Sequence, residues 1–208
     1  MSGWQAEVGQ ISDVDVSRET EGRLQDFVRL LEKWNSRINL VSPSTIATVW
    51  DRHITDSLAL ASAAPEGALS WADLGSGGGL PGLVIAILYP ELRVSLVESD
   101  KRKAAFLLTV RRELDLNVEV LAKRIEDANP LGADVVSARA LAPLPKLIDY
   151  AMRHGSRDSV FLFPKGETWR AEYDEACLTW SFDFQALDGA TGSPGKILRL
   201  TNVRQTHG

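Results

Sequence analysis

Residues 71–82 and Glu98 have the types and spacing that nucleotide binding requires. The glycines of the run WADLGSGGGLPG allow the backbone to turn tightly and to approach a ligand closely. An apolar helical segment and a strand-like segment follow, and the strand ends in Glu98, whose carboxylate could accept both hydroxyls of a ribose. A strand, a glycine loop, a helix and a second strand within residues 69–98 span one nucleotide-binding βαβ unit. The sequence therefore predicts binding of a cofactor that contains adenosine.

The glycine loop matches two cofactor templates at once. Gly77, Gly79 and Gly82 have the GxGxxG spacing of dinucleotide-binding loops. Asp73, followed by glycines at 75, 77 and 79, has the acid-plus-glycine spacing of loops that bind S-adenosylmethionine (SAM). The loop alone therefore leaves NAD(P) and SAM open, and the order of the surrounding elements must decide between them.

Two helical segments precede this loop, and strands alternate with helices after it. Apolar residues recur at helical spacing from 17 to 40 and from 44 to 63, so residues 1–65 are predicted to form an N-terminal helical extension. Residues 66–208 are predicted to form the cofactor-binding domain, packed with the extension into one compact unit. Strands are expected at 69–74, 93–98, 117–121, 133–138, 159–163, 181–187 and 196–202, and helices at 81–89, 101–114, 142–153 and 167–177.

The order of these elements favours SAM. Only a glycine-rich connection separates the last two predicted strands, which indicates an antiparallel hairpin at one edge of the sheet. A mostly parallel seven-stranded sheet with helices on both faces and such a hairpin resembles the α/β, Rossmann-like architecture of class I SAM methyltransferases. NAD is disfavoured because a helical extension precedes the loop and no second substrate domain follows the sheet.

Composition and charge restrict the setting and the partners. The chain has 208 residues, a net charge of −5 and one cysteine, Cys177. The longest apolar run, residues 80–89, is too short to cross a membrane and no export signal opens the chain, so we expect a cytoplasmic protein without a membrane partner. The net charge argues against indiscriminate coating of nucleic acid, although local basic groups such as Lys123-Arg124 could form a patch.

The segment after the fourth predicted strand, Ser137-Ala138-Arg139-Ala140, excludes several reactions. It has nothing of the Asn or Asp, two prolines and aromatic residue with which exocyclic-amine methyltransferases accept amine hydrogens. Pyrimidine C5 methylation needs a thiolate, and the only cysteine lies in a helical stretch. No P-loop, HExxH or Cys/His cluster is present, so we expect neither phosphoryl transfer nor a metal site. A transfer that needs no strong base remains, such as methylation of the exposed lone pair of guanine N7.

Three segments together resemble one family closely. They are residues 34–42 (WNSRINLVS), residues 52–57 (RHITDS) and the loop at 73–82 (DLGSGGGLPG). With SARA at 137–140 and FPKG at 163–166, they are similar in order and spacing to the bacterial small-subunit rRNA guanine-N7 methyltransferases, the RsmG or glucose-inhibited division protein B (GidB) family. The resemblance implies SAM-dependent methylation of N7 of a guanine in the decoding-region loop of 16S rRNA. The implied partner is 16S rRNA, within the small ribosomal subunit or its assembly intermediate.

The expected site combines the glycine loop and the ribose acid with residues carried over from the family. Gly75, Leu80, Ile125, Glu126 and Arg139 match the family's cofactor contacts, and Ser76, Gly77 and Glu98 complete the cofactor set. Arg139, expected to be exposed at the tip of the fourth strand, is the catalytic candidate. The residues expected to contact RNA are Arg124, Lys165 and His53, while Asn39, Arg52 and Asp56 could shape the mouth of the site.

The sequence is also compatible with proteins of two other classes. An NAD(P)-linked oxidoreductase would use the same glycine loop. A ribosome-associated binding or assembly protein could retain the fold without turnover. The intact glycine loop and Glu98 disfavour that second alternative, because a protein that binds no cofactor needs neither.

Overall fold

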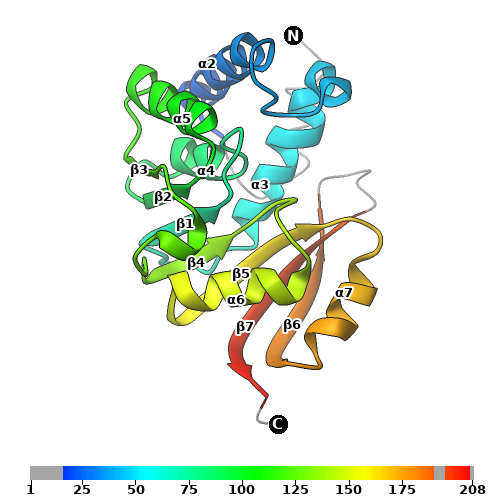
Figure 1. The fold of residues 1–208 in the computed structure, drawn as a ribbon. Coiled ribbons are helices and arrows are strands. Elements are labelled where there is room, and N and C mark those ends of the chain that lie inside the picture. The colour runs from blue at the N-terminus through cyan, green and yellow to red at the C-terminus, as the bar shows by residue number, and fades with distance from the viewer. Residues whose placement is uncertain (1–15, 190–194, 207–208) are drawn as a thin grey trace.

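Seven strands form one twisted sheet in the order β3-β2-β1-β4-β5-β7-β6 (Figure 1). The computed structural model describes residues 16–189 and 195–206. The strands are β1 (Ser70–Leu74), β2 (Arg93–Val97), β3 (Val118–Leu121), β4 (Ala133–Ser137), β5 (Gly155–Lys165), β6 (Trp180–Asp188) and β7 (Lys196–Gln205). The pairs among β1 to β5 are parallel, whereas β7 is antiparallel to both β5 and β6. The predicted hairpin at the sheet edge is confirmed.

Helices cover both faces of this sheet. The elements on the first face are α2 (Arg18–Asn35), α3 (Thr55–Ser62), α4 (Gly82–Leu88) and α5 (Lys101–Glu113); those on the second are α6 (Leu144–His154) and α7 (Trp169–Ala176) (Figure 1). Each face has its own buried apolar cluster. The predicted fold class, a mostly parallel α/β Rossmann-like sheet with helices on both faces and an N-terminal helical extension, is confirmed.

The short helix α4 is apolar on every side because it is covered on every side. Its residues 82–87 are all buried, and the helix packs against β1 and β2 beneath it and against α2 and α3 above. A helix without a polar face is stable only when neighbours enclose it. The N-terminal helices therefore belong to the same core as the sheet, and the rings of Trp34 and Phe106 meet at 5.7 Å between centroids.

The two predicted N-terminal helices differ from the structure. The first ends at Asn35 rather than near residue 40, because the Asn35 side-chain oxygen accepts hydrogen bonds from the backbone N–H groups of Leu40 and Val41 and fixes a turn. The second is divided into a 3₁₀ helix, η1 (Pro43–Thr48), a π-helix, η2 (Trp50–Ile54), and α3. The π-helical turn carries His53, and such turns frequently occur at functional sites.

No helix among the residues that the structure describes is long and apolar enough to cross a membrane.

Candidate active site

The glycine loop after β1 approaches the end of β2 closely. The backbone N–H groups of Gly75 and Ser76 both donate to the carbonyl oxygen of Val97, at 2.8 and 3.1 Å. Gly75 has a φ of 69°, and a Cβ there would lie only 2.7 Å from a methyl group of Leu141. A side chain at this position would therefore be strained and would meet the segment that follows β4, which explains the requirement for glycine.

Asp73 is buried beneath the glycine loop and is not among the residues that line the cavity described below. Its side chain is fully buried, and its Oδ1 accepts from the Ser137 hydroxyl at 2.7 Å while Oδ2 accepts from the Gly82 N–H at 3.3 Å. Burial raises the pKa of Asp73 from 3.8 to about 6, despite these hydrogen bonds. The Ser137 hydroxyl in turn accepts from the indole N–H of Trp71. Asp73 thereby joins the end of β1, the end of β4 and the first turn of α4.

Glu98 follows β2 and is held by the backbone on both carboxylate oxygens. Oε2 accepts from the Gly77 N–H at 2.8 Å, and Oε1 accepts from the Asp100 N–H at 2.7 Å. The residue is 7% exposed. A carboxylate oxygen has two lone pairs, so each oxygen keeps one for a further donor. The backbone N–H groups therefore orient Glu98 to accept from a pair of hydroxyls.

A cavity of about 290 Å³ lies at the carboxyl ends of the strands, where open α/β sheets bind ligands. The residues that line it include Gly75, Gly77, Val97, Glu98, Lys103, Lys123, Arg124, Ile125, Glu126, Arg139, Leu141 and Tyr150. Ile125 is buried in its wall, whereas Glu126 is exposed and accepts a 2.7 Å hydrogen bond from the Tyr150 hydroxyl. That bond lowers the pKa of Glu126.

Arg139 is half-buried, so the expectation of an exposed arginine was wrong. Its Nη1 lies 2.9 Å from Nδ1 of His53, and Nε2 of the same ring lies 3.0 Å from the Thr45 hydroxyl. Because a guanidinium only donates, Nδ1 must accept and Nε2 must carry the proton. Thr45 then accepts from Nε2 and donates to the carbonyl oxygen of Ser42. The N-terminal segment thus covers Arg139 and orients it.

The charges around His53 and Arg139 support the same protonation states. Burial, together with the charges of Arg139 and Arg52, lowers the pKa of His53 from 6.5 to about 4, so the ring is neutral at pH 7. Burial lowers the pKa of Arg139, while the charges of Asp56 and Asp73 raise it. The structure therefore joins His53 to Arg139 and Thr45, and the charge of Asp56 acts on Arg139.

Lys165, at the end of β5, is bound within the protein. Its Nζ donates to the Glu172 carboxylate at 2.6 Å and to the carbonyl oxygen of Ala142 at 2.7 Å. The same Glu172 oxygen accepts from the Leu144 N–H at 2.7 Å. The Lys165 side chain is only 11% exposed. It ties β5 and α7 to the segment between Arg139 and α6, and its contact with RNA stays a prediction.

A second cavity, of about 370 Å³, meets the first at Arg139 and Ala140. Its lining residues are Arg52, Asp56, Arg139, Ala140, Pro164, Lys165, Gly166, Gly189, Gly195, Lys196 and Ile197. Four of these carry a positive charge and one, Asp56, carries a negative charge. Ala140 has a φ of 52°, which places it in the left-handed region at the junction. Arg139 therefore lies at the junction of one cavity that holds Glu98 and a second that holds Asp56.

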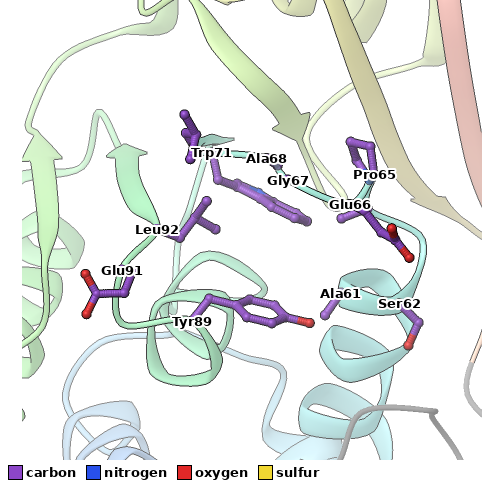
Figure 2. A pocket seen from close by; sticks show the side chains of 12 residues that line it. Ala61, Ser62, Pro65, Glu66, Gly67, Ala68, Trp71, Tyr89, Glu91 and Leu92 are labelled. Atoms are coloured by element: carbon purple, nitrogen blue, oxygen red, sulfur yellow. The ribbon is translucent and has the colours of Figure 1, made fainter.

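A third hollow, of about 470 Å³, lies at the opposite end of the sheet, among residues that precede β1 and β2 (Figure 2). Figure 2 shows the ring of Tyr89 extending toward Ala61 and Ser62 of α3. Glu66 and Glu91 belong to its lining, and none of the lining residues in ranges 16–189 and 195–206 is a lysine or arginine. Because parallel α/β sheets bind ligands at the carboxyl ends of their strands, the two cavities at Arg139 are the stronger candidates.

The predicted site residues fall into two groups. Gly75, Gly77, Glu98, Ile125, Glu126 and Arg139 line the first cavity, and Arg124 is exposed at its edge. Ser76 and Leu80 are buried and do not line it; the Ser76 hydroxyl donates to the carbonyl oxygen of Asp73. Their contacts with a ligand stay predictions. Within the described part of the chain, no cluster of His, Cys, Asp or Glu could hold a metal ion.

Sequence reasoning gave no specific role to several residues of the site. Asp56 was assigned only to the mouth of the site, and Thr45 and Tyr150 were not singled out. The segment RHITDS contained the signal for Asp56, since it places an acid three residues after His53. Nothing local distinguished Thr45 or Tyr150, whose partners lie on other elements.

Comparison with known proteins identifies relatives along nearly the whole chain. The family model described as rRNA small subunit methyltransferase G (GidB) matches residues 20–190. Ribosomal RNA small subunit methyltransferase G of Paracoccus denitrificans is 50% identical over 192 residues, which cover 92% of this chain and 99% of that protein. The protein of the same name from a Ruegeria species is 46% identical over 197 residues, with 93% and 96% covered. An O-methyltransferase from Bacillus cereus, solved in complex with SAH, is 18% identical with a TM-score of 0.62, over 96% of this chain and 98% of that one.

Proposed function

The chain belongs to the rRNA small subunit methyltransferase G family, and from this premise we propose that it transfers a methyl group from SAM to N7 of a guanine in the decoding-region loop of 16S rRNA. It is a SAM-dependent methyltransferase. The observation that carries the finer proposal is the pair of cavities that meet at Arg139. The first, which holds Glu98, suits a nucleoside cofactor, and the second, where exposed Arg52 lies with Asp56 in the lining, suits a nucleotide of RNA.

The residues of the first cavity fit SAM. The Glu98 carboxylate is preoriented by two backbone N–H groups and keeps lone pairs for the two ribose hydroxyls. The glycine loop presents backbone with no side chain at Gly75 or Gly77, so the amino acid part of the cofactor can lie against it. Buried Ile125 offers an apolar surface to the adenine ring, with Glu126 beside it. We assign these roles as part of the proposal.

The proposed transfer needs no general base. When bound, SAM supplies an electrophilic methyl group: the N7 lone pair forms the new N–C bond while the C–S bond breaks and its electron pair stays on sulfur, giving SAH and a cationic guanine. No proton leaves N7, so the protein contributes position rather than proton transfer. The neutral His53 agrees with this, because it already donates to Thr45 and accepts from Arg139.

The proposed partner is 16S rRNA in the small ribosomal subunit or in its assembly intermediate, which places the activity in the cytoplasm. With a net charge of −5, the chain has few cations to spare, so RNA must meet a local patch. Arg52 and Arg124 are exposed at the two cavities and are suited to phosphate contacts. A target guanine in structured rRNA must be turned out of its stack to reach the junction at Arg139.

The test is transfer of label from methyl-labelled SAM to small subunits that lack the modification, followed by digestion to nucleosides. We expect label in N7-methylguanosine with the wild-type protein and a loss of at least about 10-fold with Glu98→Ala purified in the same way. Binding of SAM without any transfer would favour the ribosome-associated binding protein instead. Label in another nucleoside would show that the target atom is different.

A further inference from the structure

Among the residues that the structure describes, Asp56 is the only acidic one that lines the second cavity, and the other charged lining residues are Arg52, Arg139, Lys165 and Lys196. Resting on the function proposed above, we propose that Asp56 is the specificity-determining residue of this cavity. Its carboxylate accepts hydrogen bonds from the N1–H and the N2 amino group of the target guanine. The cavity then holds the acceptor base, and the cavity with Glu98 holds the cofactor.

The shape of guanine makes this arrangement productive. Its N1–H and N2 amino group are neighbouring donors on one edge of the base, and N7 lies on the edge across the ring system. A carboxylate has acceptor positions enough for both donors. A base held at Asp56 by its donor edge therefore presents N7 away from Asp56, and the proposal places N7 at the junction with the cofactor cavity, which Arg139 and Ala140 line. Adenine has an acceptor at N1, so the same carboxylate would repel it.

The charge of Asp56 also suits the reaction. Transfer of a methyl cation to N7 leaves the base positively charged, which makes N1–H a stronger donor. A carboxylate at that edge therefore binds the transition state more strongly than the ground state, which is the condition for lowering a barrier. Among the mostly cationic lining, Asp56 provides negative charge beside the base, while exposed Arg52 can contact the phosphate.

Asp56 also acts on Arg139, since its negative charge raises the pKa of that arginine. A loss of activity on substitution would therefore not by itself distinguish base recognition from support of Arg139. The preference for guanosine over inosine separates the two roles. Inosine lacks only the N2 amino group, so it removes one of the two proposed hydrogen bonds and leaves N7 in place.

The experiment measures kcat/KM with small subunits reconstituted around 16S rRNA that carries guanosine or inosine at the mapped target. For the wild type we expect guanosine to be preferred by about 10-fold, since a hydrogen bond to a charged acceptor is lost with inosine. Asp56→Asn should lower kcat/KM for guanosine by roughly 100-fold and reduce the preference to about 2-fold or less, because one amide N–H now faces a donor. Asp51→Asn is the matched control: Asp51 is an exposed acid on the preceding π-helix η2, is not among the lining residues of the cavity, and should keep the wild-type preference on substitution.

Calorimetry with SAH distinguishes a loss of base recognition from a loss of cofactor binding. Asp56→Asn should bind SAH within about 2-fold of the wild type if only base recognition is lost. If Asp56→Asn slows both substrates equally and keeps the wild-type preference, Asp56 acts through Arg139 and the proposal is overturned. Unchanged rates on both substrates overturn it as well. A wild-type protein that methylates neither substrate would remove the proposed function, and with it this inference.

Discussion

The hydrogen bond between His53 and Arg139 should make the free energy of unfolding depend on pH. The substitution His53→Gln should remove the part of this dependence that is due to His53. In the folded chain the ring must stay neutral to accept from Arg139, and its pKa is lowered from 6.5 to about 4. The unfolded chain takes up this proton more readily. The contribution of His53 to the free energy of unfolding is therefore complete above pH 6.5 and is lost as the pH falls through 4.

The size of the effect follows from the difference between the pKa values of His53 in the unfolded and folded chains. A shift from 6.5 to about 4 corresponds to roughly 3 kcal/mol at about 1.4 kcal/mol per pH unit. His53 is only half-buried, so solvent screens part of this, and we expect about 1–2 kcal/mol between pH 7 and pH 4.5. His53→Gln can accept from Arg139 and donate to Thr45 as the neutral ring does, but it does not titrate. It should match the wild type at pH 7 and exceed it in stability by about 1–2 kcal/mol at pH 4.5.

Urea unfolding followed by tryptophan fluorescence, at several pH values between 4.5 and 7.5, measures this difference. Asp73 titrates over an overlapping range with the opposite sign, since its folded pKa is raised from 3.8 to about 6 and its contribution is lost as the pH rises through 6. Both proteins contain Asp73, so the difference between them isolates His53. A difference that is constant over the whole range would refute the neutral, Arg139-bound histidine. His53→Ala should instead be less stable than the wild type by about 1–2 kcal/mol at pH 7, since it offers Arg139 no acceptor.

Three further substitutions test other parts of the site. Glu98→Ala should weaken SAM and SAH binding by about 10-fold or more in calorimetry, and unchanged affinity would mean that the ribose lies elsewhere. Gly82→Ala should lower the free energy of unfolding by about 1–3 kcal/mol, because a Cβ there would lie 2.3 Å from Leu96 and 2.8 Å from Asp73 Oδ2; a wild-type denaturation midpoint would contradict this. Lys165→Met should lower both the melting temperature and the transfer rate, since Lys165 secures the segment after Arg139, whereas a residue that only contacts RNA would affect the rate alone.

The sheet and its helices were predictable because their signals are local. The apolar run before residue 89 predicts a helix that its neighbours enclose. A glycine loop between two short apolar segments predicts a strand-to-helix turn. Each predicted strand and helix from residue 69 onward has a counterpart in the structure. The cavity-lining positions of Gly75, Gly77 and Glu98 follow from the same local pattern, since residues after parallel strands gather at one edge of the sheet.

The contacts that orient the site were not predictable, because their partners are distant in sequence. His53 and Arg139 are 86 positions apart, and His53 lies on a π-helical turn that interrupts the predicted second helix. Helical periodicity gave no sign of this interruption, since apolar residues continue through it. Arg139 was expected to be exposed because a charged residue after a strand is normally solvated. In the structure it is half-buried, because it contacts the N-terminal segment at His53.

The most direct test of the site is a crystal structure of the protein with SAH. The two ribose hydroxyls should lie within about 3 Å of the Glu98 carboxylate oxygens, with the adenine against Ile125 and the sulfur facing the junction at Arg139. SAH in the hollow beside Tyr89, or a ribose that contacts no carboxylate, would contradict the assignment of the cofactor cavity and the methyl-transfer geometry built on it.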